Sequence, residues 1–528
     1  MHRALQIIDI VEKICEVTEY PYLQRRDLAV LARTCKLFFD SAISVLWRNL
    51  DRVSPLLRCM PSDLWDITES DSFLNLHVQR RSITSADWER PLVYMHRVRS
   101  FRVDILFETS DFLDALSSSL PRNRSYIFPN LEVLDWYPKH NPDNDHPSEV
   151  FHYLRLFLTP NLKTLPLSTT SVADFGIIGN LGLECPALKE FSLAVAFLID
   201  PQTPWDTATS GVSKFVSGLT HIESLSVPDL YDAALAHVAQ LPQLKRLDIR
   251  PATFTNLSAF PAANSFPVLT ELYLSTMEQA IAMLTTLPEC SLVEFVVGDS
   301  ENQPTNQVAR QFYSTLASRC SHSSLRDIHI RGNHTEPATF DMDQVSLYSV
   351  QGDILEPLFS FTNLVSVMLS HPVGFDLDDA TIVAMVRAWP RIESLGFQAG
   401  SSGHIPSRVT LEGLVTFSRH CPYLYCLRLT FDASVVPETN HDAEEAQQTL
   451  RYLNVALSPI DHPQRVAKFL LAIFPKLTFI ETLCDDILEE ADLGFDEYDE
   501  MDVEPHVATS HDVWKKVQES LLLVHASS

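Results

Sequence analysis

The chain has 528 residues, 45% of them hydrophobic, and a formal net charge of -28. It is longer than most single compact domains, and its surplus of carboxylates excludes a general attraction to nucleic acid or to anionic membranes. No apolar run is long enough to cross a bilayer, so we expect a cytoplasmic and/or nuclear protein that binds neither nucleic acid nor membrane.

The first 50 residues place apolar side chains at helical spacing. Three groups of such residues follow one another: Ile7, Ile10, Val11 and Ile14; Leu28, Leu31, Ala32 and Cys35; Ile43, Leu46 and Trp47. We expect three short helices, with Tyr20-Pro21 separating the first two and Asp27 capping the start of the second. A bundle this small has few core residues, so it should expose apolar surface and rely on a partner.

The same segment contains a recognisable set of motifs. These are Ile10-Val11-x-x-Ile14, then Asp27-Leu28-x-x-Leu31-Ala32-x-x-Cys35-Lys36-x-Phe38, and the closing Leu46-Trp47-Arg48-Asn49-Leu50. Residues 1–50 thus resemble an F-box, with Ile8 and Asp9 where the family usually has Pro followed by Glu. The resemblance implies binding to the Skp adaptor of an SCF ubiquitin ligase, which a cullin holds in turn.

The adaptor-binding residues that the resemblance implies are the large apolar positions of the motif: Ile10, Leu28, Leu31, Phe38 and Trp47. Side chains of this kind carry most of the energy of many interfaces. The alternative is that the three helices only cap the repeats that follow, and that some of these residues hold the bundle together.

Residues 51–97 form a linker with poor periodicity, interrupted by Ser54-Pro55 and Met60-Pro61. Its aromatic content is too high for a free tether. We therefore expect it to pack irregularly on the repeats and to fix the bundle against them.

From residue 98 to residue 484 one pattern recurs, in which Pro and one further residue precede L-x-x-L-x-L. The clearest copy is LPQLKRLDI at 241–249, and others occupy 128–136, 185–193, 266–274, 389–397 and 421–429. This pattern and its spacing are typical of leucine-rich repeats with some longer loops. Such repeats stack because a single strand and helix cannot bury their own apolar faces.

The predicted fold class is therefore α/β: a three-helix F-box followed by a leucine-rich-repeat solenoid, or horseshoe. Its concave side should be a parallel sheet and its convex side a layer of helices. Helices are expected at 229–238, 378–386 and 410–417, opened by the capping residues Asp229, Asp378 and Thr410. Bundle and repeats together make the chain similar to the F-box/leucine-rich-repeat proteins, especially their divergent fungal forms.

The C-terminal part combines an acidic run with a final helix. Residues 485–506 contain many carboxylates and neither Lys nor Arg up to Glu504, so self-repulsion predicts disorder. Within 507–528, Val513, Val517 and Leu521 lie along one helical face. That face suits a cap on the open end of the repeats.

Neither the cysteines nor the histidines form a catalytic or metal-binding pattern. The nine cysteines are an odd number without paired spacing, which predicts reduced thiols. Cys185, Cys290, Cys320 and Cys421 stand where a helix leads into a strand, a place for a small buried residue. We expect a non-catalytic protein with no cofactor and no metal.

The target site is expected on the concave sheet, at the residues just before and just after the second leucine of each repeat. Because Tyr and Arg offer large contact areas, we expect Arg246, Tyr273, His329 and Arg428 to include target-binding residues. The predicted function is substrate recognition for an SCF-type E3 ubiquitin ligase. The alternative is a leucine-rich-repeat scaffold that binds proteins without a ubiquitin role.

Overall fold

The protein is described by a computed structural model, which covers residues 8–16, 21–69, 75–104, 110–122, 124–137, 147–169, 173–195, 205–249, 265–298, 304–332, 342–399, 407–437, 446–485 and 505–527. The chain divides into two compact units, residues 1–246 (unit 1) and residues 247–528 (unit 2). The acidic segment predicted at 485–506 lies outside the described residues, except for its first residue and its last two.

Unit 1 begins with helices and continues with alternating strands and helices. The helices are α1 (Ile8–Glu16), α2 (Pro21–Ala32), α3 (Lys36–Arg48), α4 (Ser54–Leu57), η2 (Ser85–Trp88), α5 (Leu92–Met95), α6 (Ser110–Ser119), η4 (Pro147–Leu156), α7 (Ala173–Ile178), α8 (Trp205–Val216) and α9 (Asp232–Ala239). The strands are β1 (Asn49–Leu50), β2 (Trp65–Glu69), β3 (Asn75–Gln79), β4 (Ser100–Asp104), β5 (Val133–Tyr137), β6 (Thr164–Thr169), β7 (Glu190–Val195) and β8 (Ser224–Val227). Strand β9 (Arg246–Ile249) starts at the last residue of unit 1.

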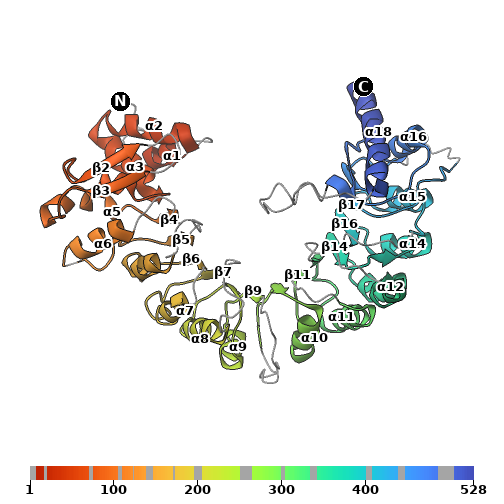
Figure 1. Cartoon of the computed structure of the whole chain (residues 1–528), viewed down its shortest axis with the longest axis horizontal. Coiled ribbons are helices and arrows are strands. Elements are labelled where there is room, and N and C mark those ends of the chain that lie inside the picture. Colours follow the sequence, from red (N-terminus) through yellow and green to blue (C-terminus); the bar gives the residue numbers. More distant parts are fainter. Residues whose placement is uncertain are drawn as a thin grey trace. The chain divides into compact units, whose positions relative to one another are not determined.

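The sheet of unit 1 is parallel, and its strands follow the chain in the order β1, β4, β5, β6, β7 and β8. Leu165, Phe191 and Leu225 occupy one register row of β6, β7 and β8, and all three are buried. Figure 1 shows α6, α7, α8 and α9 on one face of this sheet. The leucine pattern thus builds a core between strands and helices, as the sequence predicts.

The three-helix bundle runs directly into the sheet. Helix α3 ends at Arg48 and β1 begins at the next residue, where Asn49 pairs with Ser100 and Leu50 with Phe101 of β4. The bundle is therefore continuous with the first strand of the sheet, without an intervening loop.

Side-chain contacts strengthen this junction. The ring of Trp47 stacks on that of Tyr94 in α5, with centroids 4.6 Å apart and an interplanar angle of 13°. The guanidinium of Arg97 forms an ion pair with Asp40 at 2.9 Å and donates a hydrogen bond to the hydroxyl of Ser44, both on α3. Stacking and ion pairing between α3 and the end of the linker limit movement of the bundle.

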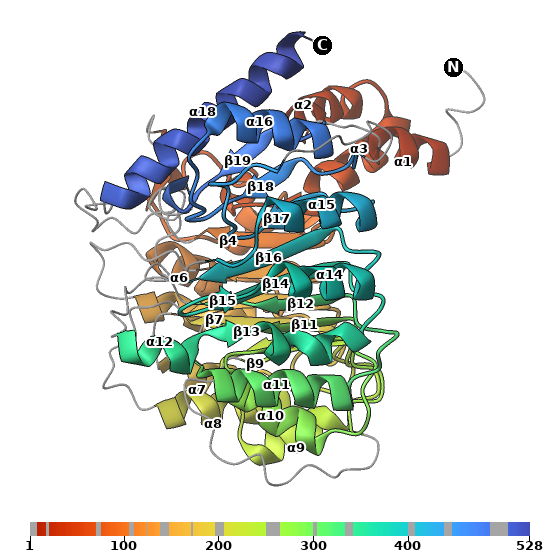
Figure 2. The same cartoon turned by 90° about the vertical axis from the view of Figure 1, so that its right-hand side faces the viewer.

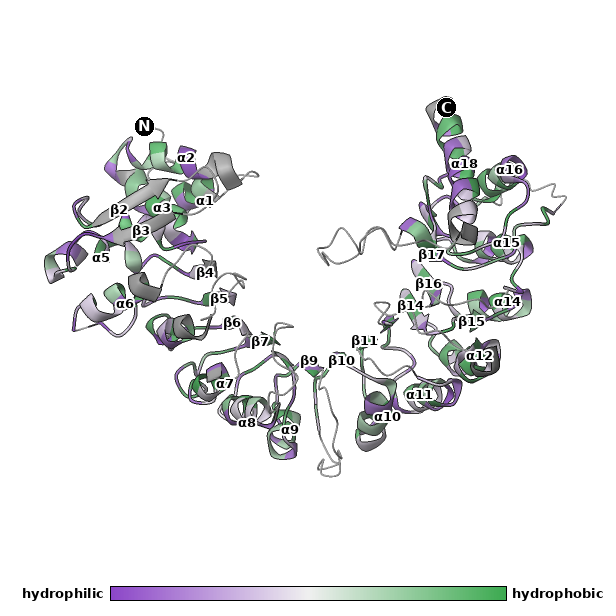
Figure 3. Cartoon of the chain, viewed as in Figure 1, coloured by the Kyte–Doolittle hydropathy of each residue, from purple (hydrophilic) through white to green (hydrophobic). Residues whose placement is uncertain are grey.

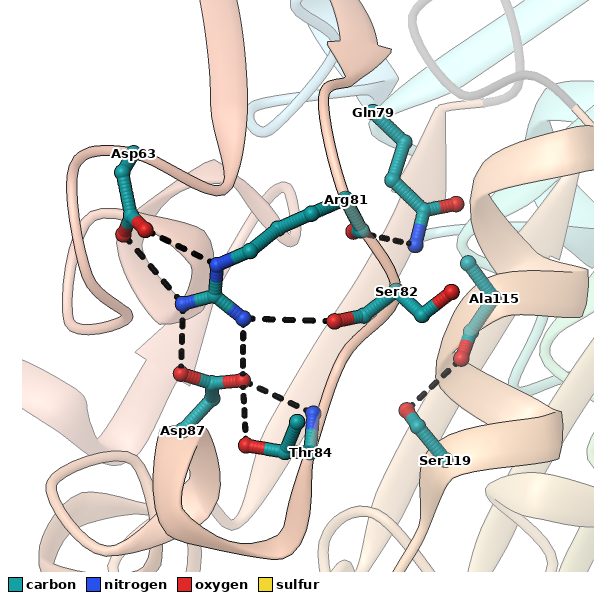
Figure 4. A network of polar contacts seen from close by, with 8 residues as sticks. All are labelled: Asp63, Gln79, Arg81, Ser82, Thr84, Asp87, Ala115 and Ser119. Carbon is teal, nitrogen blue, oxygen red and sulfur yellow. Dashed lines mark hydrogen bonds and ion pairs between the residues drawn. The ribbon is translucent and has the colours of Figure 1, made fainter.

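A second polar network organises the linker itself. Arg81, just after β3, places its guanidinium between two carboxylates, with Nε 2.8 Å from Asp63 Oδ2 and Nη1 2.8 Å from Asp87 Oδ2 (Figure 4). The same Asp87 oxygen accepts hydrogen bonds from the backbone N–H and the hydroxyl of Thr84, which closes a capping box at η2. The hydrogen bond from Arg81 holds the pKa of Asp87 well below its usual range. Ion pairs and hydrogen bonds therefore connect separate parts of the linker within the residues that the structure describes.

Unit 2 repeats the alternation of strand and helix. Its strands are β10 (Glu271–Leu274), β11 (Glu294–Val297), β12 (Asp327–Ile330), β13 (Val350–Gln351), β14 (Ser366–His371), β15 (Phe375–Asp376), β16 (Ser394–Ala399), β17 (Cys426–Arg428), β18 (Tyr452–Asn454) and β19 (Phe479–Glu481). Its helices are α10 (Met277–Thr286), α11 (Asn306–Arg319), α12 (Met342–Tyr348), α13 (Gly352–Leu355), η5 (Glu356–Ser360), α14 (Asp379–Ala388), α15 (Leu411–His420), α16 (Pro463–Ile473) and α18 (Pro505–Ser527).

The main sheet of unit 2 is also parallel, in the order β10, β11, β12, β14, β16, β17, β18 and β19. One register row crosses it through apolar side chains that are at most 2% exposed: Leu272, Phe295, Ile328, Val367, Leu395, Leu427, Leu453 and Ile480. Figure 2 shows α10, α11, α14, α15 and α16 following one another in chain order beside the strands, and Figure 3 shows both hydrophobic and hydrophilic residues on these helices. The α/β fold class with a parallel sheet is confirmed.

The predicted helix starts are correct in unit 2 and wrong in unit 1. Asp378 caps α14 by accepting from Thr381 N–H at 2.9 Å, and Thr410 caps α15 by accepting from Glu412 N–H at 3.2 Å. In contrast, α9 starts at Asp232, because the carboxylate of Asp229 instead accepts from Leu230 N–H and from the hydroxyl of Thr209 in the preceding repeat.

A similar correction applies to α2. This helix begins at Pro21, so Asp27 lies inside it and does not cap it. Pro at the first helical position has a fixed φ that suits a helix start, and its missing N–H costs nothing there.

Helix α18 covers the last strand of unit 2. Trp514, Val517 and Leu521 are buried, and the indole N–H of Trp514 donates to Ser458 O at 2.8 Å. The side chain of Gln518 accepts from Ile480 N–H, a strand-edge group that would otherwise need another partner. Figure 2 shows α18 beside α16 and β19.

Candidate protein-binding site

Of the five predicted adaptor-binding residues, some lie at the surface of the bundle and others in its interior. Ile10 on α1 is 36% exposed, whereas Leu31 on α2 and Phe38 on α3 are half-buried. Leu28 is only 5% exposed, and Trp47 is buried against Tyr94. Leu28 and Trp47 therefore stabilise the bundle and its junction with the linker.

Other apolar side chains of the bundle are more exposed than the predicted set. Ile14 on α1 is 45% exposed, Val30 on α2 48% and Phe39 on α3 38%. Ile10 and Ile14 are four residues apart, so they share one face of α1. Each helix of the bundle thus offers at least one large apolar side chain to solvent. Burial could not be read from the motif, because helical spacing alone does not tell which face meets the neighbouring helices.

The face of each sheet opposite the repeat helices is the one toward which the residues just before and just after the second leucine of each repeat are expected to point. We call these the two outward positions. Tyr273, His329 and Arg428 occupy one register row of unit 2, with Val296 between the first two, and Met368 and Gly396 between the last two. Tyr273 and His329 are two strands apart, about 10 Å at the usual strand spacing. Arg246 is the last residue of unit 1, and it occupies the other outward position.

The exposure of the predicted target-binding residues differs. Tyr273 is only 6% exposed, so its ring offers little surface to a ligand. His329 is half-buried, its Nε2 lies 3.2 Å from the hydroxyl of Ser366, and burial lowers its pKa. Arg246 and Arg428 are also half-buried. These four residues therefore do not form one continuous exposed surface.

An aromatic row on the last strands of unit 2 is better exposed. It consists of Tyr425, just before β17, and of Tyr452 and Phe479, the first residues of β18 and β19. The rings of Tyr425 and Tyr452 lie 5.1 Å apart, and those of Tyr452 and Phe479 stack at 5.0 Å with an interplanar angle of 7°. Tyr425 is 48% exposed and Phe479 47%. A hydrogen bond with Tyr452 raises the pKa of the Tyr425 phenol, so this phenol stays neutral at physiological pH.

The aromatic row was only partly visible in the sequence. Tyr452 stands at an outward position of its repeat, but Tyr425 precedes that position, and the copy that begins at Phe474 is clear only up to Leu477. Extending this copy to Ile480 would have placed Phe479 directly beside Tyr452, as the register shows.

Among the described residues no group of three or more His, Cys, Asp or Glu side chains could hold a metal ion. Within the same residues, no helix combines the length and apolar composition needed to span a membrane.

Comparisons with known proteins give distant structural similarities. No family model and no curated protein matches the sequence. The structure of the yeast Rad7 and Elc1 complex is similar with a TM-score of 0.31 and 17% identity, over 62% of this chain and 78% of that one. The leucine-rich repeat-containing protein LegL7 from Legionella pneumophila is similar with a TM-score of 0.29 and 13% identity, over 59% of this chain and 86% of that one. TM-scores this low assign neither a function nor a partner.

Proposed function

We propose that the chain is the substrate-recognition subunit of an SCF-type ubiquitin ligase. In this proposal the three-helix bundle binds the Skp adaptor, which a cullin holds, and the open face of the repeats binds a target protein. The chain itself has no catalytic role and needs no cofactor. The F-box resemblance of residues 1–50 suggests the adaptor, and the geometry of the bundle supports it.

The observation that carries the proposal is the exposure of large apolar side chains on all three helices of a small bundle. Ile10, Ile14, Val30 and Phe39 are each more than a third exposed. Apolar side chains that cluster on one small element, rather than lying singly over a surface, are typical of a docking site. A protein partner that covers them would bury apolar area that the bundle cannot bury alone.

The junction between bundle and sheet also suits a receptor subunit. Because α3 continues into β1 and β1 pairs with β4, a partner held by the bundle has a defined position relative to the sheet of unit 1. The ion pair between Arg97 and Asp40 adds a second connection between the bundle and the end of the linker. A ligase subunit needs such a fixed geometry, since ubiquitin transfer depends on the distance to the bound target.

For the target, the aromatic row offers the most suitable surface described. Tyr425, Tyr452 and Phe479 present rings in mutual contact, which limits their movement before binding, so binding costs little side-chain entropy. Tyrosines are enriched among the residues that dominate binding energy. We therefore assign target recognition to this row. Arg428, at the end of β17, is a candidate for a polar contact with the target.

Adaptor binding is tested by co-expressing the full-length chain with the Skp adaptor and measuring the adaptor and cullin that co-purify. The variant Ile14→Asp/Val30→Asp changes side chains that are already exposed, so folding should be retained. Recovery of the adaptor should fall at least about tenfold, because a buried apolar anchor contributes about 2 kcal/mol. Leu28→Asp is less informative, since it places a charge in the core of the bundle.

The matched control is Leu183→Asp, which introduces the same charge at a residue of unit 1 that is 86% exposed and lies outside the bundle. Equal adaptor recovery from wild type and the double variant would contradict the assignment of the bundle. If target proteins are still captured while the adaptor never co-purifies, the chain is a leucine-rich-repeat scaffold without a ubiquitin role.

Target binding is tested by proximity labelling with the full-length chain. We expect Tyr425→Ala/Phe479→Ala to lose targets that wild type labels, while its adaptor recovery is unchanged. Tyr423→Ala is the control, because Tyr423 is 58% exposed and lies two residues before the row. If labelling persists in the double variant but is lost in His329→Ala/Arg428→Ala, the target binds the register row of Tyr273, His329 and Arg428 instead of the aromatic row.

A further inference from the structure

Two cysteines from successive repeats of unit 2 lie in contact. Cys290 follows α10 in the connection to β11, and Cys320 follows the last residue of α11. Their Sγ atoms are 3.2 Å apart, and the two residues form an isolated parallel β-bridge. Both thiols are free in this structure.

The backbone on both sides holds the pair in register. Cys290 N–H donates to Arg319 O at 3.0 Å, and Ser321 N–H donates to Cys290 O at 2.9 Å. Residues paired in this way have Cα atoms about 4.8 Å apart, which is within the range of about 4.4–6.8 Å seen in disulfides. The sulfur atoms need to approach by only about 1 Å to reach the S–S bond length of about 2.0 Å.

The two thiols differ in access and in acidity. Cys290 is half-buried, whereas Cys320 is 3% exposed. The hydrogen bond between them lowers the pKa of Cys290 and raises that of Cys320. Cys290 is therefore the thiol that meets an oxidant first as a thiolate, and Cys320 is placed to react with the product.

The other buried thiols at helix-to-strand junctions lack this arrangement. Burial raises the pKa of Cys185 and of Cys421 to about 12, so both remain protonated thiols. Cys421 and Cys426 are close in sequence, but they do not pair across strands: the register pairs Cys426 with Ser394 and Tyr452. Cys290 and Cys320 are thus distinguished by a sulfur partner across a repeat boundary.

We propose that Cys290 and Cys320 are an oxidative modification site, at which a hydroperoxide converts the two thiols into a disulfide between successive repeats. The Cys290 thiolate attacks one peroxide oxygen, which forms a sulfenic acid and releases hydroxide or alkoxide. The Cys320 sulfur then displaces the sulfenic oxygen as water. Together the two thiols lose two protons and two electrons, and these reduce hydrogen peroxide to two molecules of water.

The disulfide would covalently close a span of 30 residues that contains β11 and α11. A cross-link of this kind restricts the unfolded chain, so it should raise the resistance of these repeats to unfolding. This inference is independent of the proposed function, because it uses only the geometry of two repeats.

The experiment uses the full-length, reduced chain, treated with hydrogen peroxide and then denatured in the presence of excess iodoacetamide. Peptide mass spectrometry should find a peptide pair joined through Cys290 and Cys320, lighter by two hydrogen atoms than the separate peptides. Hydrogen exchange of β11 and α11 should become slower after oxidation, and reductant should restore the original rate. In Cys320→Ser, Cys290 should accumulate as the sulfenic acid, which dimedone traps.

The pair Cys421 and Cys426 in the same sample is the internal control and should remain alkylated. Two results would overturn the proposal: Cys290 and Cys320 alkylated as fully as in untreated protein, or cross-links distributed equally among other cysteine pairs. Cys290→Ser provides a further check, since it should abolish the cross-link while leaving the thermal midpoint of the reduced protein unchanged.

Discussion

The residues at or just before the start of the repeat strands form an ionic row in unit 1 and an aromatic row in unit 2. The ionic row joins Arg99, Glu132 and Lys163, and further along Lys189, Glu223 and Lys245, through ion pairs of 2.6 to 3.5 Å. Each residue of the ionic row lies one residue before its strand, as does Tyr425, whereas Tyr452 and Phe479 are the first residues of β18 and β19.

The difference shows how one backbone pattern supports two kinds of surface. In the ionic row each carboxylate pairs with two basic side chains and the charges remain hydrated, so the row has little to gain from a partner. In the aromatic row Tyr452 stacks on Phe479 and Tyr425 lies tilted beside Tyr452, while Tyr425 and Phe479 remain about half exposed. Covering them would bury apolar area, which makes this row the better binding surface.

The largest effect should come from removing the support of the aromatic row. Trp514 of α18 is fully buried, and its ring meets that of Phe431 edge to face at 5.8 Å. Trp514→Ala should lower the free energy of unfolding of unit 2 by about 3–5 kcal/mol, because it leaves a cavity and removes the indole hydrogen bond to the Ser458 carbonyl. Denaturant unfolding measures the loss, and Lys516→Ala on the exposed side of α18 is the control. A loss no larger than in the control would contradict the supporting role of α18.

The two units should respond to acid in opposite directions. Burial lowers the pKa of His371 in unit 2 to about 3, and raises that of Asp174 in unit 1 to about 6. Between pH 6.5 and 3 only the unfolded chain protonates His371, so this residue lowers the stability of unit 2 as the pH falls. Between pH 6 and 3.8 only the folded chain protonates Asp174, so this residue raises the stability of unit 1 by about 2 kcal/mol as the pH falls.

Hydrogen exchange of β6 and of β14 across this pH range, corrected for the intrinsic exchange rate, measures the two trends separately. Asp174→Asn should remove the trend in unit 1, and His371→Phe should remove that in unit 2. The His371 ring is packed between Tyr313 and Phe375, so an aromatic replacement fills the same space, although it removes the hydrogen bond between His371 Nε2 and the Tyr313 hydroxyl. Parallel trends in both units would show that other groups control the acid response.

A smaller effect is expected from the stacking within the aromatic row. A double-mutant cycle of Tyr452→Ala and Phe479→Ala should give a coupling energy of about 1 kcal/mol, as for other stacked aromatic pairs. Because stacking depends little on ionic strength, the coupling should be the same at low and high salt. A coupling that disappears in high salt would show that the rings do not stack in solution.

The smallest effect should come from the ionic row. Two lysines lower the pKa of Glu223 to about 2, so Glu223 stays charged down to that pH. A cycle of Glu223→Gln and Lys245→Ala should show a coupling below that of the aromatic pair, and salt should abolish it by screening. Acidification through pH 4.5 should not weaken it, since the folded-state pKa lies lower. A coupling that persists at high salt would contradict the screened, hydrated character of the row.

The repeat pattern predicted the fold well because its leucines determine a burial period. Leu272, Leu427 and Ile480 are buried in register, as L-x-x-L-x-L requires. Capping was harder to predict. Asp378 caps its helix, but Asp229 bonds to Thr209 of another repeat, and no local signal in the sequence reveals that contact.

The candidate sites were predicted less well, because exposure is a tertiary property. The motif predicted Leu28, Trp47 and Ile10 alike as adaptor-binding residues, although packing against other elements buries the first two. Similarly, the alternation of side chains marked Tyr273 as outward, yet the folded chain covers it. The aromatic row required the tertiary structure: the register pairs Tyr452 with Phe479, and the ring of Tyr425, one residue before the register partner of Tyr452, lies beside that of Tyr452.

The direct passage from α3 into β1 has a consequence for the evolution of this chain. Each residue of a helix turns the chain by about 100°. One residue inserted between Arg48 and Asn49 would therefore either rotate the bundle about the axis of α3 or shift the pairing of β1 with β4 by one residue. Since such a shift exchanges the two faces of a strand, Leu50 would leave the core. The length of this passage should thus tolerate insertions and deletions far less than the surrounding loops do.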